Sequence, residues 1–191
     1  MIFKELRDEG SLRVPDIALK VHSKPDREGE SCVIVHAPTR PGPKGSDQIQ
    51  NAVDSLRAKG LSIEFIKLIE RPNSDVLSAI SRCDFVVDEL FSDTAMASLA
   101  SEAAVLGKPA IVGMYGYETL QKFTEPCMIP PALVCQPGEI EASIEKLVLD
   151  KEFRLALGLK ASPQISYGGV GTNITANFCG RFIDSPPLFP L

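Results

Sequence analysis

The stretch 98–112 reads SLASEAAVLGKPAIV and joins a helical pattern to a strand pattern. Small and apolar residues recur at helical spacing up to Gly107, which stands where a helix-ending glycine is expected. A lysine and a proline follow, and then a short β-type run. A single carboxylate, Glu102, interrupts the apolar part of the helix. Taken alone, this pattern predicts an amphipathic helix that packs on a parallel sheet with one polar residue near its end.

The same alternation of strand and helix patterns runs through most of the chain. We predict strands over 31–37, 61–69, 84–90, 109–114 and 132–136. We predict helices over 47–59, 75–82, 94–106, 117–123, 139–149, 152–157 and 173–183, with Ser46, Ser74, Pro137 and Thr172 at helix starts and Gly60 ending the first. Strands that alternate with helices in this way predict the fold class α/β, with a single Rossmann-like, doubly wound parallel sheet.

A length of 191 residues fits one such domain with short extensions. Residues 1–30 are polar and rich in charges, and we expect a lead-in there. The Rossmann-like domain is expected over 31–184, and an irregular tail over 185–191. There is no internal repeat.

The overall charge limits the class of partner. A formal net charge of −5 argues against a broad basic surface for nucleic acid, so an anionic ligand must meet a local cluster of positive groups. No apolar run approaches the roughly 20 residues that span a bilayer, and the N-terminus is too charged for a signal peptide. We therefore expect no membrane span and a cytoplasmic protein.

The five cysteines are widely spaced and form no C-x-x-C pair, so we expect all five to be reduced. No cluster of His, Cys and carboxylate side chains has metal-ligand spacing. We therefore predict neither a metal site nor a cofactor.

The loop HAPTRPGPKGS, residues 36–46, leaves the first predicted strand at the edge where doubly wound sheets bind ligands. Arg40 can donate two hydrogen bonds to a phosphate, and Lys44 supplies a positive charge beside a helix N-terminus. Both cations on one loop of an acidic protein suggest a diphosphate; the alternative is that both are solvated surface charges. Thr39 and His36 are further candidates, although a histidine at a strand end is also a common structural residue.

Two other sequence features bear on the site. Asp88 and Glu89 end the third predicted strand, where either a general base or a surface position is conceivable. The glycine-rich run 168–172 does not lie between a strand and a helix that open a βαβ unit, so it is not a dinucleotide-binding fingerprint. We interpret that run as a turn before the last predicted helix.

Several of these stretches together resemble a known family. The helix–glycine–strand stretch resembles the E-A-M-A-x-G-x-P-V signature of the nucleotide-sugar-binding, C-terminal half of family 4 (group 1) glycosyltransferases of GT-B type. The segment VIVHAPTRPGPKGSD resembles the lysine–glycine loop of that family, and CDFVVDEL resembles the strand before the signature helix. The resemblance continues through PALVCQPGEIEASIEKLVLDKEFRLALGLKA and covers about residues 33–161.

The resemblance implies roles for individual residues. Glu102 would bind the ribose of a nucleotide-diphosphate sugar, and Arg40 and Lys44 would hold its diphosphate. The start of the signature helix, from Thr94 to Ala97, would face the phosphate, and no bound metal is needed in this family. Active members usually carry an E-G-F-G turn where this chain has Thr-Ala-Met-Ala, and the nearest acid is Asp93. No catalytic residue is identified.

The resemblance implies a donor-binding domain that serves glycosyl transfer to a glycan or lipid-linked acceptor. A GT-B enzyme uses two Rossmann-like halves, and this chain has room for one. Transferase activity would then need a partner protein with the acceptor half, or a homo-oligomer. The alternative is a non-catalytic GT-B-like interaction or scaffold module; a fragment of a GT-B type sugar-nucleotide epimerase is a third hypothesis, for which the sequence offers no catalytic acids.

Overall fold

The structure is a computed structural model and describes residues 31–124, 129 and 131–161. The predicted lead-in, the glycine-rich run 168–172, the predicted helix 173–183 and the predicted tail lie outside the described residues. The boundaries proposed for the lead-in and the tail therefore stay predictions.

Strands and helices alternate as the sequence predicts. The strands are β1 (Cys32–His36), β2 (Ile63–Lys67), β3 (Phe85–Val87), β4 (Ala110–Gly113) and β5 (Leu133–Cys135). The helices are α2 (Ser46–Ala58), α3 (Asn73–Arg82), α4 (Ser98–Val105), α5 (Tyr117–Phe123), α6 (Ile140–Leu149) and α7 (Lys151–Ala161), and the 3₁₀ turn η3 (Pro137–Glu139) comes directly before α6.

The five strands form one sheet in the order β2-β1-β3-β4-β5, and every pair is parallel. Val35 of β1 lies opposite Val86 of β3, and Val87 lies opposite Ile111 of β4. The order reverses between β1 and β3, as it does in doubly wound sheets. The prediction of a single Rossmann-like, doubly wound sheet is confirmed.

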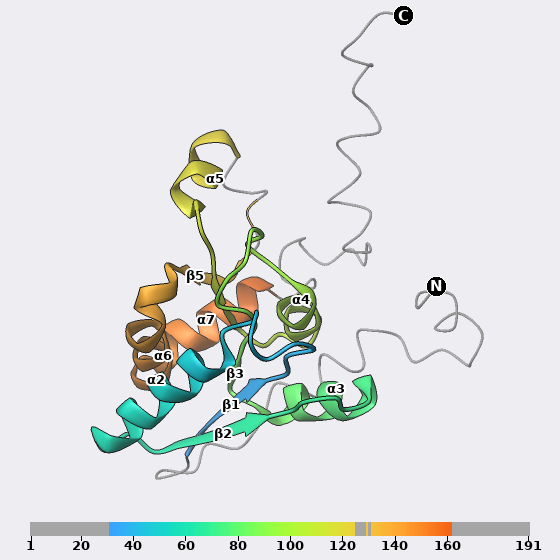
Figure 1. Cartoon of the computed structure of the whole chain (residues 1–191), viewed down its shortest axis with the longest axis vertical. Helices are drawn as coiled ribbons and strands as arrows, with labels where there is room; N and C mark the ends of the chain where they lie inside the picture. Colours follow the sequence, from blue (N-terminus) through green and yellow to red (C-terminus); the bar gives the residue numbers. More distant parts are fainter. Residues whose placement is uncertain (1–30, 125–128, 130, 162–191) are drawn as a thin grey trace, which may run out of the picture.

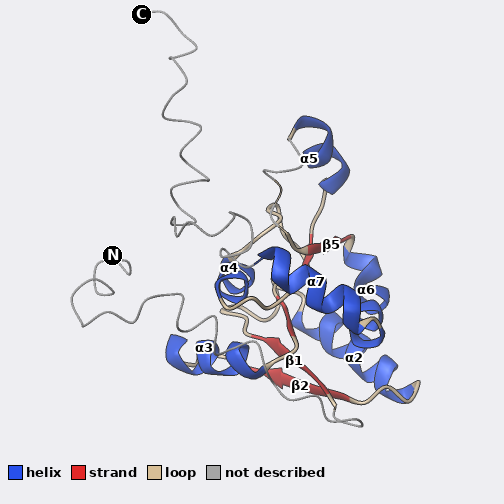
Figure 2. Ribbon diagram, turned by 180° about the vertical axis from the view of Figure 1, so that it is seen from behind, coloured by secondary structure: helices blue, strands red, loops and turns tan. Residues whose placement is uncertain are grey.

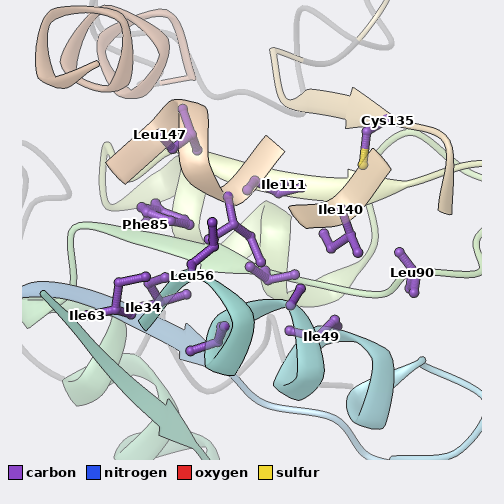
Figure 3. Packing of buried hydrophobic residues seen from close by; sticks show 14 residues of the cluster. Ile34, Ile49, Leu56, Ile63, Phe85, Leu90, Ile111, Cys135, Ile140 and Leu147 are labelled. Carbon is purple, nitrogen blue, oxygen red and sulfur yellow. The ribbon is translucent and has the colours of Figure 1, made fainter. Parts of the chain in front are cut away.

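Helices cover both faces of the sheet (Figures 1 and 2). Strand residues alternate between the two layers: Ile34 packs with α2 and α6, whereas Val33 and Val35 pack with α3 and α4. Figure 3 shows the first layer, in which Ile49 and Leu56 of α2 meet the sheet. Because both faces of the sheet are covered, the inner strands β3 and β4 are continuous apolar runs, whereas the edge strand β2 carries the exposed Glu64.

Helix α4 ends just before the glycine where the sequence pattern predicts its end. Gly107 takes a left-handed conformation with φ 67°. Its N–H donates to the Ala104 carbonyl, and the Lys108 N–H donates to the Ala103 carbonyl at 2.8 Å, which is the Schellman pattern. Gly158 of α7 lies against the Gly107 carbonyl so closely that any Cβ there would collide with it.

The predicted starts of three helices are wrong. Ser46 is the first residue of α2 rather than its N-cap, and the N-cap is Gly45. Helix α3 begins after Pro72, one residue before the predicted cap Ser74. The third error is larger, because α4 begins at Ser98 and not at 94.

A local turn explains the late start of α4. The Ser92 hydroxyl oxygen accepts the Thr94 N–H at 3.0 Å, and the same hydroxyl lies 2.9 Å from the Thr94 carbonyl. Serine side chains that bond to nearby backbone in this way compete with helix formation. Residues 94–97 are therefore a turn that leads into the helix.

Three further features complete the described part of the chain. Helix α5 has no buried residue and projects from the layered body in both views (Figures 1 and 2).

Cys83 and Cys135 are buried thiols, one in each apolar layer. Within 31–124 and 131–161, no helix is long and apolar enough to cross a membrane.

Gly45 fixes the start of α2 and offers a test of the loop. Its φ is 73°, and an added Cβ would lie 2.6 Å from Leu90 Cβ. We expect Gly45→Ala to lower the free energy of unfolding by about 2–4 kcal/mol, from backbone strain and overpacking together. Gly42, in the same loop, has open space around a Cβ and no positive φ, so Gly42→Ala should change stability by less than about 0.5 kcal/mol. Urea unfolding of both variants measures this, and equal losses would contradict the role given to Gly45.

Candidate functional site

The candidate site lies at the carboxyl edge of the sheet. There the chain leaves the neighbouring strands β1 and β3 in opposite directions, to β2 on one side and to β4 on the other. Each strand is followed there by a loop: 37–45 after β1, 68–72 after β2 and 88–97 after β3. In open α/β sheets, ligands bind in the crevice formed by such loops.

The loop after β1 is folded into turns that hold it close to β3. The Ser46 N–H donates to the Pro41 carbonyl, and the Gly45 N–H donates to Gly42, each at 3.0 Å. The Lys44 carbonyl accepts the Leu90 N–H, also at 3.0 Å. The loop backbone is thereby attached to the chain that follows β3.

His36 is a structural residue at the base of this loop. Its side chain is fully buried, with Nδ1 2.8 Å from the Val87 carbonyl oxygen and Nε2 2.7 Å from the Ser46 hydroxyl oxygen. Because a carbonyl only accepts, Nδ1 carries the proton, and Nε2 accepts from the Ser46 hydroxyl. Burial lowers the pKa of His36 to about 4. The imidazole is therefore neutral and joins β1, β3 and α2.

Lys44 lies beside two carboxylates. Its Nζ is 3.4 Å from Glu89 Oε2 and 3.7 Å from Asp88 Oδ1, and its side chain is 16% exposed. The sequence places these two acids at a strand end but gives no signal that they pair with Lys44, because the pairing joins loops about 45 residues apart.

Asp88 directly follows β3, and its buried carboxylate lies at the start of α4. Its side chain is 1% exposed, and its Oδ2 accepts the Ala100 N–H at 2.8 Å. Burial raises the pKa of this carboxyl above its ordinary value, while the Ala100 N–H and the Lys44 ammonium oppose the rise. The alternative of a solvent-exposed surface position for Asp88 is wrong.

The remaining residues expected at the phosphate end are spread along the loops. Arg40 and Thr39 are exposed on the loop after β1. Thr94 belongs to the Ser92 turn, Asp93 is exposed beside it, and Ala97 is the residue before α4. The expectation that a helix start at 94–97 faces a phosphate is corrected accordingly: the first helical turn begins at Ser98.

A cavity of about 360 Å³ opens at this edge, on the α3–α4 side of the sheet. Its wall consists of residues 37–39 after β1, the segment 68–76 around the start of α3, and the first turns of α4 up to Glu102. This volume is within the range of small-ligand pockets, about 300–1,000 Å³. The cavity brings Thr39 and Glu102 together, whereas Lys44 is not part of its wall.

Glu102 is half-buried in that wall. Burial raises the pKa of its carboxyl, and the negative charge of Asp88 raises it further, while a hydrogen bond from the Asn73 side chain opposes both. Asn73 was not predicted as a site residue, because only the crossover from β2 to α3 brings it to α4. No local signal in the sequence marks it.

The segment after β2 contributes polar groups that were also not predicted. Glu70 has a positive φ of 51°, and Arg71 follows it; both line the cavity. A non-glycine residue in this conformation is a strained position of the kind found at ligand sites. Among the described residues, no group of three or more His, Cys, Asp or Glu side chains could hold a metal ion.

His36 makes the stability of the fold depend on pH. In the unfolded chain its pKa returns to about 6.5, so between pH 6.5 and 4 the unfolded state binds more protons than the folded state. The contribution of neutral His36 to the free energy of unfolding is therefore complete above pH 6.5 and is lost as pH falls toward 4. This loss amounts to at most roughly 3 kcal/mol. We expect His36→Gln to be less stable than the wild type at pH 7, with the gap closing toward pH 4. Guanidinium unfolding of both chains across this range measures the gap, and parallel pH profiles would contradict the assignment.

No protein-family model matches the chain, and no curated protein matches its sequence. By structure, it is similar to a TarM variant from S. aureus in complex with fondaparinux, α-GlcNAc-glycerol and UDP, with a TM-score of 0.56 and 13% identity. The match covers 86% of this chain and 37% of the TarM chain, so this chain spans little more than a third of that protein. The fold is that of one Rossmann-like half of a GT-B structure.

Proposed function

We propose that this chain is the donor-binding half of a family 4 type GT-B glycosyltransferase and binds a nucleotide-diphosphate sugar. The observation that carries the proposal is the cavity of about 360 Å³ at the sheet edge with Glu102 in its wall. A fold of this kind binds ligands at that edge, and a half-buried carboxylate there is an acceptor for sugar hydroxyls.

Glu102 has the chemistry of a ribose ligand. A carboxylate accepts hydrogen bonds at both oxygens, so it can take one from each of two neighbouring hydroxyls. The Asn73 side chain favours the charged form of this carboxyl group, and partial burial strengthens the hydrogen bonds that it can accept. Leu68 and Val76 give the same cavity an apolar side against which a nucleobase can pack.

The diphosphate would lie toward the loop after β1. Thr39 lines the cavity and Arg40 follows it directly. A bound ligand whose phosphate extends out of the cavity on this side would therefore meet an exposed guanidinium. Lys44 would add its charge after it leaves Asp88 and Glu89. Together the cations would stabilise the leaving diphosphate during glycosyl transfer.

Transfer would require the other half of a GT-B enzyme. The TarM variant is a longer chain, of which this chain covers 37%. We propose that a partner protein, or a second copy of this chain, supplies the acceptor side and a catalytic group, and that the acceptor is a glycan or a lipid-linked sugar.

A second candidate function is a non-catalytic GT-B-like interaction module. Two observations favour it: Lys44 already has carboxylate partners, and the turn 94–97 contains alanines where glycines would present backbone N–H groups. The two candidates differ in one measurement, because only the first requires binding of UDP or GDP. Calorimetric titration of the whole chain to millimolar nucleotide distinguishes them.

The role of Glu102 can be tested by its removal. We expect Glu102→Ala to weaken UDP or GDP binding by about 1–3 kcal/mol, because buried hydrogen bonds to a charged group are lost. Glu152→Ala, at an exposed position in the first turn of α7, should leave the affinity unchanged. Isothermal calorimetry measures both variants, and an unchanged affinity in the Glu102 variant would remove its assignment.

The role of Arg40 is tested by comparing two ligands. We expect Arg40→Ala to weaken UDP binding by about tenfold at low salt and to leave uridine binding unchanged, because uridine has no phosphate for the guanidinium to contact. Arg82→Ala, which removes an exposed cation at the end of α3, serves as the matched control for net charge. Equal losses for UDP and uridine would argue against a phosphate contact.

A further inference from the structure

The positive groups that should receive a phosphate are in contact with the protein's own carboxylates. The first turn of α4 donates the Ala100 N–H to Asp88 Oδ2 at 2.8 Å. The Lys44 ammonium lies 3.7 Å from Asp88 Oδ1 and 3.4 Å from Glu89 Oε2. Asp88 therefore contacts both a helix N-terminus and a cation, which are the two features that attract phosphate groups.

Burial makes these contacts strong. Asp88 is 1% exposed and Lys44 is 16% exposed, so water screens their attraction less than it screens a surface pair. The helical turn that Asp88 holds also forms part of the cavity wall, through Ser98 and Leu99. A ligand phosphate near this turn would experience the negative charge of Asp88 directly.

We propose that Asp88 is a specificity-determining residue that competes with a ligand's phosphate groups for Lys44 and for the first turn of α4. This inference rests on the proposed nucleotide site. A diphosphate gains Lys44 only when the ammonium leaves Asp88 and Glu89, whereas a nucleoside without phosphate does not disturb these contacts. Asp88 thus lowers the preference of the site for nucleoside diphosphates over nucleosides.

The substitution Asp88→Asn separates charge from structure. The asparagine side chain keeps a carbonyl oxygen that can accept the Ala100 N–H, and it removes the negative charge. Of its two carboxylate partners, Lys44 then keeps Glu89. The start of α4 no longer lies against a negative charge.

The experiment measures UDP and uridine affinities of the whole chain by calorimetry at low salt. We expect Asp88→Asn to bind UDP roughly tenfold more tightly than the wild type, as removal of one nearby like charge predicts at an effective dielectric constant near 20. Uridine affinity should stay within about twofold. Measured against Lys44→Met alone, the gain should be smaller in the double variant Asp88→Asn/Lys44→Met, because the part that depends on the released ammonium is lost and only the part at the start of α4 remains.

Each result bears on the proposal. An unchanged or weakened UDP affinity in Asp88→Asn, with uridine binding retained, overturns it. If that variant does not fold, Glu89→Gln decides: this acid is 20% exposed and touches Lys44, so its removal should tighten UDP binding about threefold, and no gain overturns the proposal. Absence of both UDP and uridine binding in every variant rejects the proposed function, and this inference with it.

Discussion

The carboxyl end of β3 is the point on which the rest of the structure depends. The Val87 carbonyl accepts a hydrogen bond from the Nδ1–H of His36, and the Nε2 of the same ring bonds to Ser46 at the start of α2. The Asp88 carboxylate holds the first turn of α4, and the Leu90 N–H holds the loop at Lys44. The loop after β1 and the loop after β3 are therefore connected through a few residues at the end of one short strand, and their relative positions follow from that strand.

Close packing around Leu90 leaves these loops little freedom. Gly45 lies against the Leu90 side chain and Gly113 against its backbone, so neither position has room for a Cβ. Contacts without spare space transmit any shift of one loop to the next. The loops after β1 and β3 are therefore held in one arrangement where they meet Leu90.

The sequence predicts the sheet well because each strand carries a short apolar or β-branched run and each crossover has its own helix. It predicts helix starts poorly, because a serine hydroxyl can bond to a distant side chain instead of capping the helix. The Ser46 hydroxyl, for example, bonds to His36, and the N-cap of α2 is Gly45. In the site, Glu102 lies in the cavity wall, and its role as a ribose ligand stays a prediction. The contacts of Lys44 and Asn73 could not be predicted, because they arise from chain crossovers that no local pattern records.

Helix α5 differs from the other α-helices of the described chain because it contributes no residue to the apolar layers. It is seven residues long, none of them buried, and Phe123 at its end is 84% exposed. So short a helix has little stability without tertiary packing. Its backbone amides should therefore exchange with solvent through local opening, independently of the global unfolding that protects β3 and β4.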